Sequence, residues 1–406
     1  MNPDPRAWLF SLEHLGVKLG LDQMTKLLTA LGNPHHRFPS VLVAGTNGKG
    51  SVTAMVDAAL IAAGYRTARY TSPHLERLEE RFVVSGREAP AADLDAALTR
   101  VRQAVENLTA VGEFATSPTF FECATAAAFR LFARASVDIA TVEVGLGGRL
   151  DATNVLEPLV CAITTIDYDH EAQLGTTIEA IAAEKAGIIK PGTPVVIGRL
   201  PAEADAVVAG HAERAGAPLV RAHDTRLPAE LLPGLAGAHQ RDNAIVASTV
   251  LETLTTCGFS ISEAARREGI ADVRWPGRLE RFTHNGRDVL IDAAHNPAGA
   301  RALAAFIGDT GWMGAALVFA AMHDKDSRGM LSALAPVAGH IVCTTAPTDR
   351  ASRAGDLAQV ALECGASAVE VVEDPAAALD RACALSDRVV VAGSMFLIGP
   401  LRGILR

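Results

Sequence analysis

Short apolar runs alternate with longer amphipathic stretches along most of this chain. Runs such as Val41–Ala44 and Val137–Val144 have the length and the β-branched content of buried strands. Stretches between such runs, for example residues 91–110, place leucine and valine at helical spacing. A regular alternation of strands and helices is typical of a mostly parallel sheet covered by helices, so the pattern predicts an α/β fold.

The alternation starts again from Val289, and 406 residues is long for a single domain. Glycine, proline and a His-Asn-Gly turn cluster near residues 280–285, as expected of a boundary. The strands expected beyond it are Val289–Ile291, Ala315–Ala320, Ile341–Thr344, Ala368–Val372 and Arg388–Ala392. We therefore predict a domain over residues 1–281 and a smaller doubly wound, Rossmann-like domain over residues 282–406.

One glycine-rich turn carries the strongest chemical signal. The strand Val41–Ala44 runs into Gly45-Thr46-Asn47-Gly48-Lys49-Gly50-Ser51, and a helix is expected over Val52–Ala63. Glycines let backbone N–H groups approach an anion, and a helix N-terminus adds a partial positive charge. Lys49 can reach terminal phosphates and Ser51 can offer a hydroxyl to Mg²⁺. A tight turn without a ligand is the alternative, but the lysine and hydroxyl after the glycines favour phosphate binding.

Three further polar residues follow or end predicted strands. Ser72 follows the strand 66–70, Glu143 lies near the end of Val137–Val144, and His170 follows Val160–Ile166. Doubly wound sheets bind ligands at the carboxyl ends of their strands, and oxygen ligands with one imidazole suit Mg²⁺ or Mn²⁺. The alternatives are a polar turn for Ser72, a salt bridge from Glu143 to Arg149, and a satisfied polar residue for His170.

Candidates on helices have simple structural alternatives. Gln240 and Asn243 share one face of a helix expected to run to about Thr256, where their amides suit adenine or simply cap the helix. Glu122 has capping-box spacing from Thr119, which is an adequate account of it. Lys185 lies near the end of a helix from Thr177 to Ala186, where an exposed lysine is the alternative to a functional one.

The glycine turn has two residues between its first glycine and the Gly-Lys pair, where the common nucleotide loop has four. This variant resembles the ATP loop of the Mur ligase superfamily, and the chain is similar to its folylpolyglutamate synthase/dihydrofolate synthase branch. The resemblance covers nearly the whole chain and rests on several motifs in the family's order. They include Ser72-Pro73-His74-Leu75, the Thr-Phe-Phe-Glu run ending at Glu122, Glu143–Asn154, His239-Gln240 with Asn243, and Asp292–Pro297.

The resemblance implies a fold and a set of nucleotide contacts. It implies a Mur-ligase-like P-loop ATPase domain followed by a Rossmann-like ligase domain, with ATP between them. The residues expected at the nucleotide are Gly45, Thr46, Asn47, Gly48, Lys49, Gly50, Ser51, Gln240, Asn243, Arg278 and Asp292. Within that set the family places Asn243 at adenine, Arg278 at the phosphates and Asp292 at the ribose.

It also implies a metal centre and catalytic residues. Mg²⁺ ligands are expected at Ser51, Ser72, Glu143 and His170. The matching family lysine is carbamylated by CO₂, so Lys185 is expected to be N6-carboxylated and to serve a second Mg²⁺. Carbamylation needs a neutral amine, which burial favours. Lys49, Lys185 and His295 are the expected catalytic residues, while His74, Glu122, Asp324, Lys325 and Ser394 receive no firm role.

The implied reaction is ATP-dependent amide formation through an acyl phosphate. L-glutamate is expected to be joined to dihydropteroate and to reduced folates, placing the enzyme in folate and one-carbon metabolism. Only one of these two activities, or another Mur-type amino-acid ligase, remains the alternative. The short glycine loop and the second domain disfavour a P-loop kinase or GTPase switch. Glu143, His170 and Lys185 together disfavour a non-catalytic nucleotide-binding protein.

Composition adds limits on partners. A net charge of -9 and a pI of about 5.8 argue against binding to nucleic acid or an anionic membrane. The six cysteines form no C-x-x-C pair and are expected to be buried free thiols of a reducing compartment. No signal peptide or membrane-length apolar run is evident. The expectation is a cytoplasmic protein, and a monomer as is usual in the family.

Overall fold

The computed structural model describes residues 4–16, 18–224 and 231–406. Its contacts divide the chain into two compact units. The first comprises Met1–Ile166, Thr176–Pro233 and Asp242–Val273; the second comprises Asp167–Gly175, Gly234–Arg241 and Arg274–Arg406. Two short segments of the N-terminal part thus join the second unit. The domain limits expected from the sequence, 1–281 and 282–406, assign residues 274–281 to the first domain, whereas their contacts group them with the second unit.

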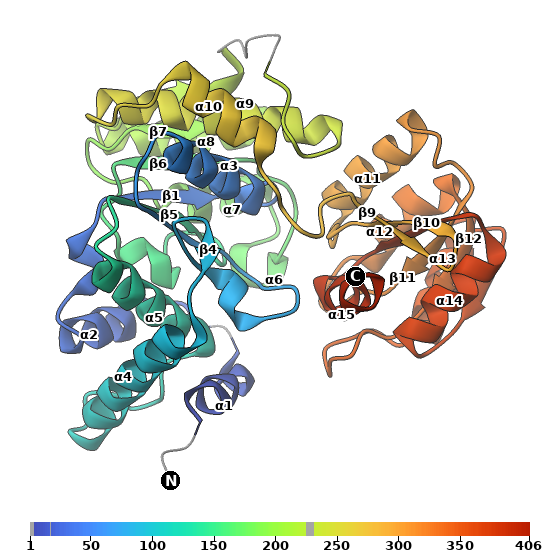
Figure 1. The fold of residues 1–406 in the computed structure, drawn as a ribbon, viewed down its shortest axis with the longest axis horizontal. Helices are drawn as coiled ribbons and strands as arrows, with labels where there is room; N and C mark the ends of the chain where they lie inside the picture. Colours follow the sequence, from blue (N-terminus) through green and yellow to red (C-terminus); the bar gives the residue numbers. More distant parts are fainter. Residues whose placement is uncertain (1–3, 17, 225–230) are drawn as a thin grey trace. The chain divides into compact units, whose positions relative to one another are not determined.

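The first unit is built on a mostly parallel sheet, which confirms the expected α/β class (Figure 1). Its described strands follow the order β4-β3-β2-β5-β1-β6-β7-β8. Their bounds are β1 Ser40–Ala44, β2 Thr67–Tyr70, β3 Phe82–Val84, β4 Arg87–Glu88, β5 Ile139–Glu143, β6 Val160–Ile163, β7 Val195–Ile197 and β8 Leu219–Arg221. The central strands β1, β5 and β6 are buried throughout, as their continuous apolar runs require.

Helices cover both faces of this sheet: α3 and α10 lie on one side, and α2, α4 and α5 on the other (Figure 1). The helices that begin and end in the first unit are α1 Pro5–Phe10, α2 Asp22–Ala30, α3 Lys49–Ala62, α4 Ala91–Ala110, α5 Phe120–Ala135, α7 Ile178–Ala186, α8 Ala202–Arg214 and α10 Glu263–Asp272. Helix α9, Ala238–Thr256, begins in the second unit and continues in the first. Helix α6, Glu171–Leu174, belongs to the second unit. Short 3₁₀ turns lie at Glu13–Leu15, Pro34–Arg37, Leu78–Arg81, Ala152–Val155, Ala222–Asp224 and Ala335–Val337.

Several helix ends follow directly from their capping residues. Thr119 accepts from the Glu122 N–H at 3.2 Å while the Glu122 carboxylate accepts from the Thr119 N–H at 2.8 Å, so the expected capping box starts α5. The Thr177 hydroxyl caps α7 by accepting from the Ala180 N–H at 3.2 Å, and this helix ends at Ala186 as expected. The predicted start of α3 at Val52 is wrong. The helix begins at Lys49, because the apolar period does not extend into its first turn.

The second unit has a six-stranded sheet in the order β13-β12-β11-β14-β10-β9 among the described residues. The strands are β9 Glu280–His284, β10 Arg287–Ile291, β11 Ala315–Phe319, β12 Ala338–Cys343, β13 Val369–Val371 and β14 Arg388–Ala392. The helices are α11 Pro297–Asp309, α12 Ser327–Leu334, α13 Ala354–Glu363, α14 Pro375–Leu385 and α15 Met395–Leu405. One apolar cluster joins residues of α11, α12 and α13 to the sheet. The edge strand β9 was not expected, because the His-Asn-Gly sequence that reads as linker is the turn of an antiparallel β9–β10 hairpin.

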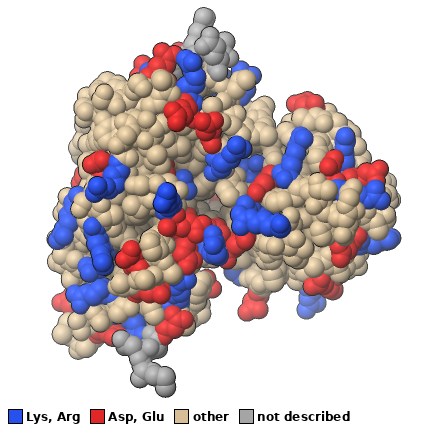
Figure 2. Space-filling view, viewed as in Figure 1, with Lys and Arg blue, Asp and Glu red and all other residues tan. Residues whose placement is uncertain are grey.

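The expectations about cysteines and membrane segments can be compared with the described residues. All six cysteines are free thiols, but Cys257 and Cys364 are only partly buried. No helix there is long and apolar enough to cross a membrane. Acidic and basic side chains are interspersed on the face shown in Figure 2.

Candidate active site

The phosphate loop is tied to the end of β6 by several hydrogen bonds. The Thr46 N–H donates to the Thr165 carbonyl at 2.8 Å, and the Asn47 N–H donates to the Thr165 hydroxyl at 3.0 Å. The Thr164 hydroxyl donates to the Asn47 carbonyl at 2.6 Å. A Cβ atom on Gly45 would collide with the Thr164 side chain, so only glycine fits this close crossing. The loop is thereby held open at the N-terminus of α3, which is the geometry of an anion site.

Two lysine side chains converge on one backbone carbonyl of this loop. Lys49 Nζ lies 3.0 Å from the Gly45 carbonyl oxygen and 3.1 Å from that of Thr46. Lys185 Nζ lies 3.1 Å from the same Gly45 oxygen, although it comes from the last turn of α7. Lys185 is 4% exposed, so the alternative of a solvated surface lysine is wrong. Its helix delivers it to the phosphate loop.

Ser72 and Glu143 are brought together by the neighbouring parallel strands β2 and β5. The backbone N–H of Ser72 donates to Glu143 Oε2 at 3.1 Å, and Glu143 is 5% exposed. The alternative partner, Arg149, instead places its guanidinium on Glu184, with its terminal nitrogen 2.7 Å from Oε1. The alternative considered from the sequence, a salt bridge between Glu143 and Arg149, is therefore wrong. A buried carboxylate at a strand end suits a bound cation.

The two residues expected at adenine, Gln240 and Asn243, are assigned to different units. Asn243, 5% exposed, lies in the first unit and packs against the loop: a Cβ atom on Gly48 would collide with its side-chain oxygen. Gln240 is buried and belongs to the segment grouped with the second unit. Asn243 thus lies beside the phosphate loop, as a nucleotide contact requires, while the role of Gln240 stays a prediction.

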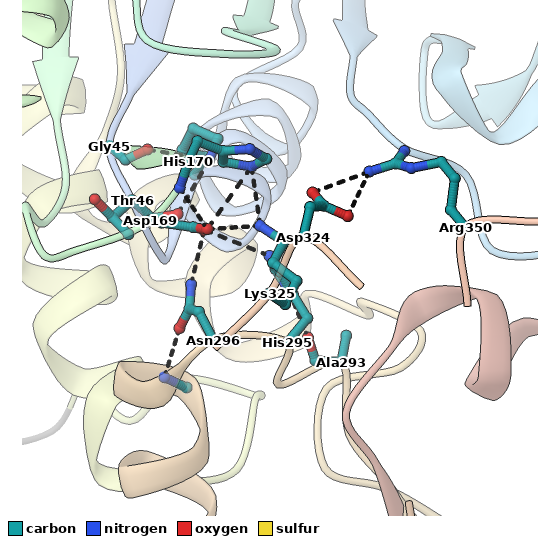
Figure 3. A network of polar contacts seen from close by, with 12 residues as sticks. Gly45, Thr46, Asp169, His170, Ala293, His295, Asn296, Asp324, Lys325 and Arg350 are labelled. Carbon is teal, nitrogen blue, oxygen red and sulfur yellow. Dashed lines mark hydrogen bonds and ion pairs between the residues drawn. The ribbon is translucent and has the colours of Figure 1, made fainter. Parts of the chain in front are cut away.

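A polar network in the second unit surrounds Asp169 (Figure 3). Lys325 Nζ lies 2.6 Å from Asp169 Oδ1 and 3.1 Å from His170 Nε2. The Asn296 side-chain amide donates to Asp169 Oδ2 at 3.0 Å, and His295 Nε2 lies 3.9 Å from the same oxygen. His170 and His295 therefore share one carboxylate and one ammonium. Neither Asp169 nor Asn296 was assigned a role from the sequence, although each is next to an expected site histidine.

Burial and the charges of this network together set the protonation states of Asp169 and His295. Burial works to raise the pKa of Asp169, but His170, Lys325 and His295 outweigh it and hold that pKa well below the usual range. Burial lowers the pKa of His295 to about 4, with Lys325 acting in the same direction and Asp169 against it. His295 Nδ1 lies 2.8 Å from the Ala293 carbonyl. Since a carbonyl only accepts, the neutral ring carries its proton on Nδ1 and leaves Nε2 as a hydrogen-bond acceptor.

Arg278 and Asp292 lie at the start of the main segment of the second unit. Both oxygens of Asp292 accept backbone bonds, Oδ2 from Leu279 at 3.0 Å and Oδ1 from Ala294 at 2.9 Å. Burial raises the pKa of Asp292 against the opposing charges of Arg278 and His239. Asp292 thus orders the turn that carries Arg278, and its contact with a ribose stays a prediction.

The residues without a firm role are now mostly accounted for as structure. Asp324 pairs with Arg350 at 3.0 Å, and Ser394 caps α15 through the Phe396 N–H. His74 is different, because its Nδ1 accepts from Arg81 Nε at 2.8 Å. Burial, aided by the Arg81 charge, lowers the pKa of His74 to about 4.

Arg81 and two phenylalanines form a group that the sequence did not reveal. The buried Arg81 guanidinium lies 5.1 Å from the centre of the Phe120 ring, and Phe10 packs against both Phe120 and His74. Phe10 is 39% exposed, so an aromatic face remains open to solvent. Rings and a guanidinium in this arrangement suit a flat, polar aromatic ligand. The nearby motif Ser72-Pro73-His74-Leu75 was the only sequence signal.

Comparison with known proteins decides the family. Residues 277–395 match the family described as "Mur ligase, glutamate ligase domain". The dihydrofolate synthase/folylpolyglutamate synthase of Bacillus subtilis is 36% identical to the chain, and the alignment covers 98% of each. This chain belongs to the dihydrofolate synthase/folylpolyglutamate synthase family of Mur ligases. The expected family and the expected α/β fold are both confirmed.

Solved structures of this family agree over the whole length. The Mycobacterium tuberculosis folylpolyglutamate synthase complexed with ADP and AMPPCP has a TM-score of 0.91 at 36% identity, covering 99% of each chain. E. coli FolC in complex with DHPP and ADP has a TM-score of 0.87 at 32% identity, covering 99% of this chain and 98% of that one. A bifunctional folylpolyglutamate synthase/dihydrofolate synthase with Mn, AMPPNP and L-glutamate bound has a TM-score of 0.86 at 31% identity, covering 100% and 98%.

Proposed function

We propose that this protein is an ATP-dependent ligase that joins L-glutamate to dihydropteroate and to reduced folates. The observation that carries the proposal is the phosphate loop with two lysine amines converging on the Gly45 carbonyl. The relatives contribute the substrates, since their names and complexes specify dihydrofolate and folylpolyglutamate synthesis, ATP analogues and glutamate. A single one of the two activities is the alternative.

The reaction needs a carboxylate to become an acyl electrophile. An oxygen of the acceptor's carboxylate attacks the γ-phosphorus of ATP, the bond to ADP breaks, and an acyl phosphate forms. The amine of glutamate then attacks the acyl carbon, and inorganic phosphate leaves as the amide forms. Phosphoryl transfer depends mainly on positioning and charge neutralisation, which we assign to the loop N–H groups, Lys49 and Arg278.

We place His295 beside the reacting phosphate or the acceptor. Burial lowers the pKa of its ring to about 4, so His295 stays neutral and is too weak a base to take the proton of the glutamate ammonium ion. Its Nδ1–H is held by the Ala293 carbonyl, which leaves Nε2 as a hydrogen-bond acceptor for the substrates. The ion pair of Lys325 with Asp169 lies beside this ring and fixes its surroundings.

The residues fit a divalent cation of the Mg²⁺ class. Glu143 is a buried carboxylate at a strand end, and Ser51 stands in the first turn of α3 after the phosphate loop. With Ser72 and the imidazole of His170 they form the donor set that we propose for the metal. When bound, the cation neutralises phosphate charge. A second Mg²⁺ is proposed at Lys185.

Lys185 is proposed to carry the N6-carboxyl group. Its amine is buried and shares the Gly45 carbonyl with the Lys49 ammonium. Burial and a nearby like charge both favour a neutral amine, which is the form that reacts with CO₂. The N–C bond that forms releases one proton and leaves an anionic carbamate with carboxylate-like oxygens.

The carbamate is tested by carbon-13 NMR of protein equilibrated with ¹³CO₂. We expect one carbamate resonance that is missing from Lys185→Ala. The variant should lose activity by about a hundredfold, as for loss of one group that stabilises the transition state. Acetate should restore part of it by supplying the missing carboxylate. A fully active Lys185→Ala enzyme and an unchanged NMR spectrum would reject the modification.

The ligase activity is tested with a substrate panel. Purified protein is incubated with ATP, Mg²⁺, L-glutamate and either dihydropteroate or tetrahydrofolate, and phosphate and amide product are quantified together. We expect one phosphate per amide bond with each acceptor, and a loss of at least about a hundredfold in Lys49→Ala. Lys26→Ala, which removes an exposed ion pair with Glu113, is the matched control. Phosphate release without amide, or no release, would contradict the proposal.

The setting of the enzyme follows the family. We propose that it works as a monomer in the cytoplasm, where its free thiols are stable. Gel filtration with light scattering tests the first point, and a dimer at enzyme-assay concentrations would overturn it.

A further inference from the structure

The turn Gly277–Glu280, here called the Arg278 turn, is held unusually tightly for a surface connection. Gly277 and Leu279 are buried on either side of the half-buried Arg278. The Leu279 side chain belongs to the apolar core of the second unit. Its φ of +48° is in the left-handed region that residues other than glycine rarely adopt, so the surrounding contacts must hold it there.

Three hydrogen bonds fix the backbone of the Arg278 turn, and a fourth holds one of the carboxylates that it binds. The Gly277 carbonyl accepts from the Ala293 N–H at 2.8 Å, and the Gly277 N–H donates to Glu280 Oε2 at 2.8 Å. The Leu279 N–H donates to Asp292 Oδ2 at 3.0 Å, and the other oxygen of Asp292 accepts from Ala294. The N–H groups of the two residues that flank Arg278 are thus bound to carboxylates, which are themselves held in place.

Glu280 is held by an arginine from the far end of the chain. Arg402, on the C-terminal helix α15, donates from Nε to Glu280 Oε2 at 2.8 Å and from a terminal nitrogen to Oε1 at 2.9 Å. The Arg402 side chain is 7% exposed. Burying a guanidinium is costly unless it is paired, and this two-pronged pair also fixes the orientation of the carboxylate. Oε2 then accepts from Arg402 and from the Gly277 N–H together.

We propose that Arg402 and Glu280 are positioning residues that set the direction of Arg278 toward the ATP phosphates. The inference rests on the proposed phosphate role of Arg278. A guanidinium on a loose turn would spend much of its time away from the phosphate, and a shift of about 1 Å at a charge-stabilising group can cost about a hundredfold in rate. The bonds from Arg402 through Glu280 to Gly277 remove that freedom before substrate binds.

A double-mutant cycle tests the proposal by its dependence on Arg278. Arg402→Met, Arg278→Ala and the double variant are compared with wild type for kcat and for the KM of ATP, with Tm measured in parallel. We expect about a hundredfold loss of kcat for Arg278→Ala and about tenfold for Arg402→Met. Adding Arg402→Met to Arg278→Ala should cause less than about a twofold further loss, because the group being positioned is gone. The KM of L-glutamate should stay unchanged.

Arg381 provides the matched control. It makes the same two-pronged pair, with Glu370 at 2.7 and 2.8 Å, in the same unit but on the exposed surface. Arg381→Met should leave kcat unchanged. Arg402→Lys should keep the charge yet recover only part of kcat, because it cannot hold both carboxylate oxygens. If Arg402→Met does not fold, the same double-mutant cycle is measured with Arg402→Lys in its place, and its result decides the proposal.

The outcomes separate this inference from the function it rests on. Wild-type kinetics in Arg278→Ala would reject the phosphate role of Arg278 and with it the positioning. A large effect of Arg278→Ala with an undiminished effect of the Arg402 variant in that background would reject the positioning alone. A fall in Tm with unchanged kcat in Arg402→Met would show a purely structural pair and would also overturn the proposal.

Discussion

At the scale of single residues, burial decides which charge states this molecule can use. Lys185 and Glu143 are both nearly inaccessible, and both lie at the ends of elements that face the phosphate loop or a neighbouring strand end. His295 and His74 are held neutral at physiological pH because burial lowers their pKa values to about 4. The two imidazoles therefore stay neutral well below the pH at which a free histidine becomes protonated.

The buried histidine His35 should make the free energy of unfolding depend on pH. Its pKa is lowered to about 4 by burial and by His36, and its buried Nδ1 has no hydrogen-bond partner among the residues that the structure describes. The folded state therefore favours the neutral ring, whereas the unfolded chain takes up a proton below about pH 6.5. The contribution of His35 to the free energy of unfolding is fully present above pH 6.5 and is lost as the pH falls towards about 4. Allowing for partial exposure, we expect a loss of about 2 kcal/mol over that range.

The measurement is urea unfolding of wild type and His35→Leu at pH 7.5 and pH 5. The variant should lose less stability than wild type on acidification, since it has no imidazole to protonate on unfolding. His14→Gln removes an exposed imidazole as a control. Equal losses in wild type and His35→Leu would show that His35 does not contribute.

At the scale of elements, local sequence determined most of the helices and the central strands. The capping pairs at Thr119 and Thr177 specify their helix starts through contacts a few residues away, so sequence reading succeeded there. It failed for the start of α3, because the first turn, Lys49-Gly50-Ser51, has no apolar residue that would show the helical period. It also failed for β9, whose partner is defined by pairing and not by its own pattern.

The packing of α3 against α10 gives an element-scale prediction. A Cβ atom on Gly269 of α10 would collide with backbone atoms of Ala58 and Ala59 in α3. Neither helix can relieve that clash by turning a side chain, so Gly269→Ala should destabilise the first unit by about 3 kcal/mol. Because α3 begins at Lys49, the KM of ATP should rise as well.

Gly210 is the matched control for this substitution. It also lies inside a helix of the first unit, but a Cβ there meets only the end of the Arg214 side chain. Gly210→Ala should stabilise by about 0.5–1 kcal/mol through helix propensity. Thermal unfolding of the two variants measures both effects. A neutral Gly269→Ala would mean that the two helices can separate at little cost.

At the scale of the whole molecule, the chain passes repeatedly between its two units. Segments Asp167–Gly175 and Gly234–Arg241 come from the N-terminal part yet belong to the second unit. Sequence periodicity cannot show this, because such segments are short and carry no core of their own. The family resemblance supplied the candidate residues His170 and Gln240 on these segments, but their partners, such as Lys325 for His170, required the structure.

Asp169 shows how such a segment is bound to the second unit. Its carboxylate is nine-tenths buried against Lys325, Asn296 and His295. Removing its charge leaves the buried Lys325 ammonium without its carboxylate, so Asp169→Asn should destabilise the second unit by about 3 kcal/mol. Trp275 and Trp312 lie in that unit and Trp8 lies in the first, so tryptophan fluorescence during urea unfolding in EDTA follows the second unit when all variants are made in a Trp8→Phe background.

A second substitution separates charge from packing. Lys325→Met in the Asp169→Asn background should restore most of the loss, because no buried charge is then left unpaired. Asp167→Asn is the control, because Asp167 lies on the same segment as Asp169 but makes an exposed ion pair, 2.7 Å from Arg301. Breaking that pair should lower the free energy of unfolding by less than about 1 kcal/mol. If Lys325→Met failed to rescue Asp169→Asn, the segment would be held by contacts other than this ion pair. The second unit's stability would then not depend on the charge that Asp169 brings to it.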